Sequence, residues 1–291
     1  MIYIKTTDNM GLPACWVRKE GVGRSFAIKR LVVPLSALVF ALALAAGCGG
    51  GGSAGGGGEI NVYAASSLSD AFGEMKETFE EQNADTEVRL NFAGSSALLT
   101  QLQQGAPADV FASADEEKMQ SALADGLVES PRDFVTNELI VIVPAANSAG
   151  IEDMQDLAQP GLRLVLANEG VPVADYTQEV LEKANARYGA DFSERVLANI
   201  ASREADVKAA ANRVSVGDAD ATFVYTSDVT PAIEKRVRPI EIPPDLNVVA
   251  TYPVAVTVGS SNPELARKWV DFVSSEEGGR ILENWGFEPA G

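Results

Sequence analysis

Two apolar strands that each run directly into a serine-rich helix start constrain the fold of this chain more than any other feature. Residues 60–64 alternate between inward apolar and outward polar side chains, and a helix follows from about Ser67. Residues 88–92 repeat this alternation, and a second helix follows from about Ser95. The order strand, helix, strand predicts a parallel sheet, in which neighbouring strands end at the same edge. Ligands of open α/β sheets bind outside that edge, so we expect the two junctions to lie side by side at a binding site.

Helix starts of this composition favour anions. Ser67 and Asp70 form an S-x-x-D capping pattern, which predicts a serine hydroxyl bonded to a free N–H of the helix. The unpaired N–H groups and the positive end of the helix dipole attract a negative ligand even without Lys or Arg. A single junction of this kind is more often an ordinary capped helix. A binding site at these junctions therefore requires further donors from elsewhere in the chain.

The composition excludes several classes of function. The chain has no His, which rules out Ser-His-Asp and Cys-His catalysis and His-based metal sites. Its net charge is −18, and it becomes −22 without residues 1–47, which hold six basic and two acidic residues. Nucleic acids and anionic membrane surfaces need clustered positive charge, so we expect neither as a partner. Cys15 and Cys48 are too few for a disulfide framework.

The N-terminus reads as an export signal. A basic pair at residues 29–30 precedes an apolar run of 16 residues that ends at Ala46, shorter than the roughly 20 needed to span a bilayer. The small residues before Cys48 resemble a bacterial lipoprotein processing site, in which this Cys carries the lipid. An ordinary secretory signal with an incidental Cys is the alternative. The sequence thus predicts a leader over 1–47 and a lipidated Cys with a glycine-rich tether over 48–58.

Strands and helices continue to alternate after the tether. Further strands are expected at residues 108–112, 139–144, 162–166, 221–225 and 252–258. Further helices are expected from Asp115, over about 173–188, 193–199, 263–274 and 276–285, and from Asp206. The units after residue 144 are numerous enough to form a second lobe with its own core.

Two of these helix starts leave backbone N–H groups free. Pro172 suits the first helical position, so that the N–H of Val173 comes next without a partner. Asp206 can cap the later helix, which then starts at Val207. Each feature alone is more often simple helix punctuation than the mark of a site.

Six stretches together carry a resemblance to a known family. They are residues 62–68, 92–96, 105–115, 223–228, 252–255 and 286–287. On these, residues 59–291 resemble the molybdate-binding proteins of bacterial molybdate uptake, which are substrate-binding lipoproteins of ABC transporters. The block Gly-Ala-Pro-Ala-Asp at 105–109, combined with the two serine junctions, is the specific part of the match. Related sulfate and ferric binders share the architecture without this set.

The resemblance implies an α/β fold of two lobes, the type II periplasmic-binding-protein fold. Each lobe would be a mostly parallel sheet flanked by helices, and two crossover segments would join the lobes. Residues 59–139 and 254–291 would form lobe 1, and residues 140–253 lobe 2. The lobes would close around the ligand by a hinge motion, and the protein would be a monomer.

The resemblance also implies a set of ligand-binding residues. Ser67 and Ser95 would each give a hydroxyl and a backbone N–H, Val173 and Val207 a backbone N–H, and Tyr225 its hydroxyl. These are neutral donors, which suit a tetrahedral dianion because that ion offers only acceptors. No catalytic residue, cation site or cofactor other than the bound oxyanion is implied, and the protein would not be an enzyme.

The expected function is high-affinity binding of molybdate and tungstate outside the membrane and delivery to an ABC importer. The expected partners are the permease and, through the lipid on Cys48, the membrane, which gives a lipid-anchored or periplasmic location. Another oxyanion such as sulfate, or a ferric ion, remains an alternative ligand. An amidase based on Ser95 and Ser96 is a further alternative, although it needs a Lys base that the mature chain does not offer in a comparable setting. The plainest alternative is that every serine junction is only a cap.

Overall fold

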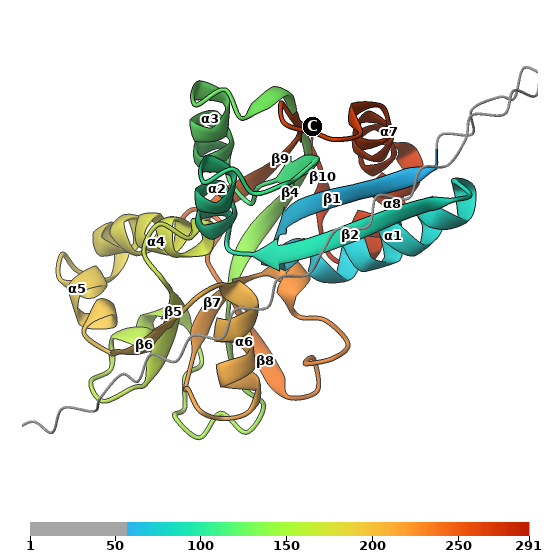
Figure 1. The fold of residues 1–291 in the computed structure, drawn as a ribbon. Helices are drawn as coiled ribbons and strands as arrows, with labels where there is room; N and C mark the ends of the chain where they lie inside the picture. The colour runs from blue at the N-terminus through green and yellow to red at the C-terminus, as the bar shows by residue number, and fades with distance from the viewer. Residues whose placement is uncertain (1–56, 291) are drawn as a thin grey trace, which may run out of the picture. The chain divides into compact units, whose positions relative to one another are not determined.

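The two serine-rich junctions lie next to each other in the computed structural model of this chain (Figure 1). Strands β1 (Gly58–Ala65) and β2 (Thr86–Ala93) pair in parallel, with Ala65 opposite Ala93. Both strands therefore end at the same edge of the sheet, and the segments that follow them start there. The expected neighbourhood of the two junctions is confirmed.

The structure describes residues 57–290, all within one compact unit of the chain, Gly52–Gly291. The predicted leader and Cys48 lie outside the described residues, as does the tether up to residue 56. Among residues 57–290, no helix combines the length and the apolar run that crossing a membrane requires.

The first lobe is built on a sheet with the strand order β10-β4-β9-β3-β1-β2. Besides β1 and β2 it holds β3 (Val110–Ala112), β4 (Val128–Pro144), β9 (Val249–Thr257) and β10 (Glu288–Pro289). The strands β1, β2 and β3 run parallel, whereas β9 is antiparallel to β3 and to β4. The first lobe is thus mixed, with its parallel half at the β1 and β2 side.

Helices cover both faces of this sheet (Figure 1). Helices α1 (Ser69–Gln82), α7 (Pro263–Val273) and α8 (Glu276–Asn284) pack together on one face, and α2 (Ser95–Gln103) and α3 (Glu116–Ala124) pack on the other. The residues of β3 alternate between the two faces, as strand geometry requires. Val110 and Ala112 belong to the core cluster under α1 and α7, and Phe111 to the separate cluster under α2 and α3.

Aromatic packing fixes the first of these faces. Trp269 of α7 is fully buried and meets Phe72 and Phe79 of α1 edge to face, with ring centroids 5.7 and 5.2 Å apart. Edge-to-face contacts of this kind add to the burial of the rings themselves. The buried aromatic faces of α1 and α7 therefore form the core on this side of the sheet.

The second lobe is built around the C-terminal part of β4. There, β4 pairs with β7 (Thr222–Tyr225) and β8 (Val237–Glu241), and a parallel pair of β5 (Leu164–Ala167) with β6 (Ile200–Glu204) is joined to β7 by a bridge from Leu164 to Ala221. Helices α4 (Pro172–Tyr188), α5 (Phe192–Leu197) and α6 (Val207–Ser215) complete this lobe. The exact lobe boundaries at residues 139 and 253 remain predictions.

Strand β4 is longer than the sequence predicted. Only residues 139–144 were expected as a strand, yet β4 begins at Val128. Its pairing with β9 is interrupted between Glu129 and Arg132 and again between Asp133 and Val135, and Ser130 has a positive φ of 48°. Such bulges disturb the two-residue alternation from which a strand is recognised.

Candidate functional site

A small cavity lies between the two lobes, at the carboxyl ends of β1, β2 and β7. It is lined by residues of the first lobe, Ala65, Ser66, Ser67, Gly94, Ser95 and Ala114, and of the second, Val171, Pro172, Val173, Val207 and Tyr225. No charged side chain is among them. The cavity volume is about 10 Å³, far below the roughly 300–1,000 Å³ of pockets that hold drug-sized molecules. A drug-sized ligand is therefore excluded.

All five residues predicted to bind the ligand line this cavity. They are Ser67, Ser95, Val173, Val207 and Tyr225. The cavity brings them together from five separate segments, which are the starts of α2, α4 and α6, the end of β7, and the turn before α1.

Ser67 lies in a single 3-10 turn, Ser66–Leu68, directly before α1, and it is buried. Its Oγ lies 3.0 Å from the Oη of Tyr252 on β9. The predicted capping pattern with Asp70 is wrong, because neither this turn nor α1 has a side-chain cap. Both side chains instead have tertiary partners, since the carboxylate of Asp70 pairs with Lys208 at 2.6 Å.

The hydrogen bond between Ser67 and Tyr252 is expected to run from the Tyr252 hydroxyl to the Ser67 oxygen when an anion is present. Burial raises the pKa of the Tyr252 hydroxyl well above its ordinary value, so that this hydroxyl keeps its proton. Tyr252 can donate to Ser67, and the Ser67 proton is then free to point at a ligand. A hydroxyl that already accepts one hydrogen bond is a better donor to the next group.

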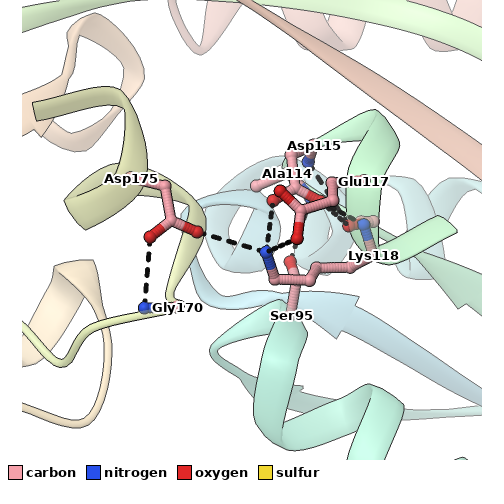
Figure 2. Close-up of polar contacts among 8 residues, drawn as sticks. Ser95, Ala114, Asp115, Glu117, Lys118, Gly170 and Asp175 are labelled. Carbon is pink, nitrogen blue, oxygen red and sulfur yellow. Dashed lines mark hydrogen bonds and ion pairs between the residues drawn. The ribbon is translucent and has the colours of Figure 1, made fainter. Parts of the chain in front are cut away.

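Ser95 is the first residue of α2, and its side chain is positioned by a hydrogen bond from Ala114 (Figure 2). Its Oγ accepts a hydrogen bond from the backbone N–H of Ala114 at 3.0 Å, which leaves the hydroxyl proton to donate. Gly94 is the residue before α2, and a Cβ there would lie 3.0 Å from the carbonyl oxygen of Ala205 and 3.4 Å from Val171. Glycine thus permits a close approach of the two lobes beside Ser95.

The second lobe contributes two helix starts. As predicted, Pro172 opens α4 and Asp206 caps α6, where its carboxylate accepts the N–H of Ala209 at 2.9 Å. The first N–H groups of a helix have no acceptor within the helix. The N–H of Val173 and that of Val207 therefore remain available at the cavity, and the dipoles of both helices add positive potential there.

Tyr225, at the end of β7, completes the wall. It is 1% exposed, and its Oη has no hydrogen-bond partner among residues 57–290. Burial, reinforced by the neighbouring Tyr252, raises the pKa of this hydroxyl well above its ordinary value, so that it is a donor at neutral pH. A buried polar group without a partner is costly, and native proteins rarely keep one without a reason. The group that would satisfy it is an acceptor inside the cavity.

The arrangement therefore offers hydroxyl and amide donors with no charged side chain among the lining residues. It can hold a small ion or molecule rich in acceptors. Within the described part of the chain, no group of three or more His, Cys, Asp or Glu residues is placed to hold a metal ion.

Sequence reasoning missed the residues that position the two serines. Tyr252 and Ala114 both fall inside stretches that carry the family resemblance, but their contacts with Ser67 and Ser95 span 185 and 19 residues of sequence. Pattern and spacing give no signal for such long-range pairs. Their position within the two stretches of family resemblance was the only signal in the sequence that could have pointed to them.

The sequence is similar to those of bacterial binding proteins. The sequence pattern of the family described as bacterial extracellular solute-binding protein matches residues 60–288. The molybdate-binding protein ModA of Mycobacterium tuberculosis is 38% identical over 229 residues, which cover 78% of this chain and 84% of that protein.

Solved structures agree. A Clostridium difficile substrate-binding domain, whose description names a molybdenum ABC transporter, has a TM-score of 0.60 and 29% identity over 80% of this chain and 99% of its own. The sulfate-binding protein SubI of Mycobacterium tuberculosis has a TM-score of 0.70 and 19% identity over 80% of this chain and 87% of its own, which is a likeness of fold alone. The predicted two-lobed type II periplasmic-binding-protein fold is confirmed.

Proposed function

The chain belongs to the bacterial extracellular solute-binding proteins, in the group of the molybdate-binding proteins, and from this premise we propose that its interlobe cavity binds molybdate. The observation that carries the proposal is the buried Tyr225 hydroxyl, which has no partner among residues 57–290 and lies in a cavity walled by other neutral donors. A tetrahedral dianion has four oxygens that only accept hydrogen bonds. It satisfies this hydroxyl and the free helix N–H groups at once.

In the proposed complex each predicted residue has a role. Ser67 and Ser95 each donate a hydroxyl proton and a backbone N–H, Val173 and Val207 donate their backbone N–H groups, and Tyr225 donates its hydroxyl proton. Neutral donors suffice in a water-excluded cavity, because the low local dielectric strengthens each hydrogen bond and the helix dipoles stabilise the negative charge. This local attraction is needed because the chain as a whole is acidic.

The same donor set gives selectivity. Monohydrogen phosphate needs an acceptor for its proton, which a site of donors does not provide. Sulfate is smaller than molybdate and would leave some donors out of reach. Tungstate has nearly the size and charge of molybdate and would bind equally well.

The proposal extends to transport. The family is extracellular by description. We infer that Cys48 carries a lipid, that the glycine-rich tether holds a monomeric binding protein close to the membrane, and that an ABC permease takes the anion from it. The lobes, joined through β4 and β9, would close on the anion and open at the permease. The protein would bind and deliver its ligand without chemical change.

Calorimetric titration of the full chain with molybdate, tungstate, sulfate and phosphate tests the proposal. We expect one site, tight binding of the first two anions and none of phosphate. Tyr225→Phe should weaken molybdate binding, whereas the matched control Tyr188→Phe, in α4 and away from the cavity, should not. Tight sulfate binding with no response to molybdate would make the protein a sulfate binder instead.

A further inference from the structure

Two ion pairs connect the lobes beside the cavity, and the lysine comes from a different lobe in each pair. The Nζ of Lys118 on α3, in the first lobe, lies 3.1 Å from Oδ2 of Asp175 on α4, in the second (Figure 2). The Nζ of Lys208 on α6, in the second lobe, lies 2.6 Å from Oδ2 of Asp70 on α1, in the first. Each lobe therefore supplies one lysine and one aspartate.

The first pair joins α4, which carries Val173, to α3, whose cap Asp115 lies next to the Ala114 N–H that bonds Ser95. In the first lobe, Lys118 also lies 3.4 Å from Asp115, the residue that caps α3. Asp115 directly follows Ala114, whose N–H donates to the Ser95 hydroxyl. On the other side, Asp175 accepts the N–H of Gly170 at 3.1 Å, just before α4 begins (Figure 2). The lysine side chain is only 9% exposed. The ion pair is thus linked, through Asp115 and Gly170, to the residues that line the cavity on the first lobe and on the second.

The second pair joins the segments that carry Ser67, Val207 and Tyr225. Lys208 directly follows Val207, and its Nζ also lies 3.4 Å from Oδ1 of Asp228, whose side chain is fully buried. The other oxygen of Asp228 accepts the backbone N–H of Tyr225 at 3.0 Å. On the first lobe, Asp70 lies three residues after Ser67 in the opening turn of α1.

Both lysines keep their charge. Burial lowers the pKa of Lys118, but the carboxylates of Asp115 and Asp175 outweigh it and hold the pKa above its ordinary value. Burial likewise lowers the pKa of Lys208, and Asp228 and Asp70 outweigh it in the same direction. The attraction between the lobes therefore persists throughout the neutral range.

We propose that Lys118 with Asp175 and Lys208 with Asp70 form a reciprocal latch that holds the lobes in the ligand-binding arrangement. The latch is separate from the donors that touch the anion. Ion pairs within one lobe, such as Arg132 with Asp271, do not change when the lobes separate, whereas both latch pairs break. The latch would therefore set how fast the ligand escapes, and the cavity donors would set which ligand is held. Only the identity of that ligand rests on the proposed function.

The aspartates are the positions to change, because each lysine then keeps a carboxylate of its own lobe. Asp175→Asn leaves Lys118 with Asp115, and Asp70→Asn leaves Lys208 with Asp228. An Asn at 175 can still accept the N–H of Gly170. Both variants are therefore expected to fold, and Asp271→Asn, which breaks a pair within the first lobe, is the matched control.

Stopped-flow dissociation of molybdate from the full chain measures the latch. The aspartate of each pair is partly exposed, 42% for Asp175 and 37% for Asp70, so solvent screens the pair. The range for screened ion pairs predicts about a two- to five-fold faster release for each single variant, with the double variant near the product of the two. Added salt should speed release from the wild type and have little effect on the double variant. The control should release molybdate at the wild-type rate.

A variant that keeps the charge separates a latch from a merely structural role. Asp175→Glu retains a carboxylate opposite Lys118 and should release molybdate at close to the wild-type rate, whereas Asp175→Asn should release it faster. Hydrogen exchange of the ligand-free protein at residues 94–99 and 171–177 provides a readout that needs no oxyanion. Exchange in the double variant should be faster than in the wild type.

These outcomes distinguish two failures. If the wild type binds no oxyanion while exchange rises in the double variant, the proposed function fails and the latch stands. If the double variant releases molybdate and exchanges its amides at wild-type rates, the latch is wrong whatever the ligand. Release from Asp175→Glu as fast as from Asp175→Asn would also contradict it.

Discussion

The two walls of the cavity present their donors by different means. On the first-lobe wall the donors are the hydroxyls and backbone N–H groups of Ser67 and Ser95, and each hydroxyl is already bonded to a partner, Tyr252 or Ala114. On the second-lobe wall two donors are backbone N–H groups at helix starts, and the third is the Tyr225 hydroxyl without a partner among residues 57–290. The first wall is oriented before a ligand arrives.

This difference predicts how each wall responds to substitution. A change on the first wall should disturb both the free protein and the complex, because it breaks a hydrogen bond that already exists. A change on the second wall should act mainly on the complex. Side-chain identity matters little at Val173 and Val207, since a helix start supplies the same N–H with almost any residue.

The largest effect is expected from Val207→Pro. Proline is tolerated at the first helical position, and the preceding Asp206 already has the extended backbone, φ −158° and ψ 175°, that proline requires. The substitution removes one N–H and puts a ring carbon where that N–H pointed, so molybdate affinity should fall by about 100-fold or more, at least the ~1.5–3 kcal/mol of a hydrogen bond to a charged group. Calorimetry gives the value. Val207→Ala keeps the N–H and serves as control, and equal affinities for the two variants would show that this amide does not bind the ligand.

Ser67→Ala tests the first wall. It removes a donor to the anion and leaves the buried Tyr252 hydroxyl without its partner, so both affinity and stability should drop. We expect molybdate binding to weaken by about 1–3 kcal/mol and the free protein to lose about 1 kcal/mol. Urea unfolding without ligand measures the second quantity. A variant that is fully stable yet binds poorly would mean that the wall is not prepared in advance.

Tyr225→Phe tests the second wall. The hydroxyl has no partner among residues 57–290, so its removal breaks no hydrogen bond within that part of the protein. Stability should stay unchanged or rise slightly, while molybdate binding weakens by about 1–3 kcal/mol. Thermal unfolding with and without molybdate separates the two effects. A clear loss of stability in the ligand-free state would erase the contrast with Ser67→Ala.

The sequence predicted which residues line both walls better than it predicted the hydrogen bonds and ion pairs that hold these residues. Ser95, Val173 and Val207 follow from helix punctuation together with the family resemblance, because helix starts are local features that leave a local pattern. The S-x-x-D pattern at Ser67 and Asp70 misled, since the two side chains are drawn to Tyr252 and Lys208, partners that no local rule can see.

The same limit explains what was missed in the fold. The alternation of strands and helices was enough to predict two lobes. The bulged first half of β4 was not recognised, because its irregular register removes the periodicity on which strand prediction depends. The ion pairs between the lobes were invisible for the same reason as Tyr252, since Lys208 and Asp70 are 138 residues apart.

A smaller effect is expected from Tyr252→Phe, which keeps the Ser67 hydroxyl but removes the group that orients it. Molybdate affinity should fall by about two- to ten-fold, the range of one neutral hydrogen bond. Tyr63→Phe, outside the cavity lining, is the matched control. If Tyr252→Phe matched Ser67→Ala in affinity, Tyr252 would itself contact the ligand, and the first wall would hold three donors.

The smallest effect is expected from pH. Because burial holds the pKa of the Tyr225 hydroxyl well above its ordinary value, molybdate affinity should change by less than about two-fold between pH 7 and 9. Stability has a definite sign. A group whose pKa rises on folding stabilises the protein below its unfolded pKa, here about 10, and this contribution is lost as the pH climbs beyond that value. Urea unfolding at pH 9 and 11 should show a smaller loss for Tyr225→Phe than for the wild type. A fall in affinity with a midpoint below pH 9 would instead mean that the hydroxyl ionises readily, and that the second wall is not the dry, proton-retaining surface on which the contrast between the walls depends.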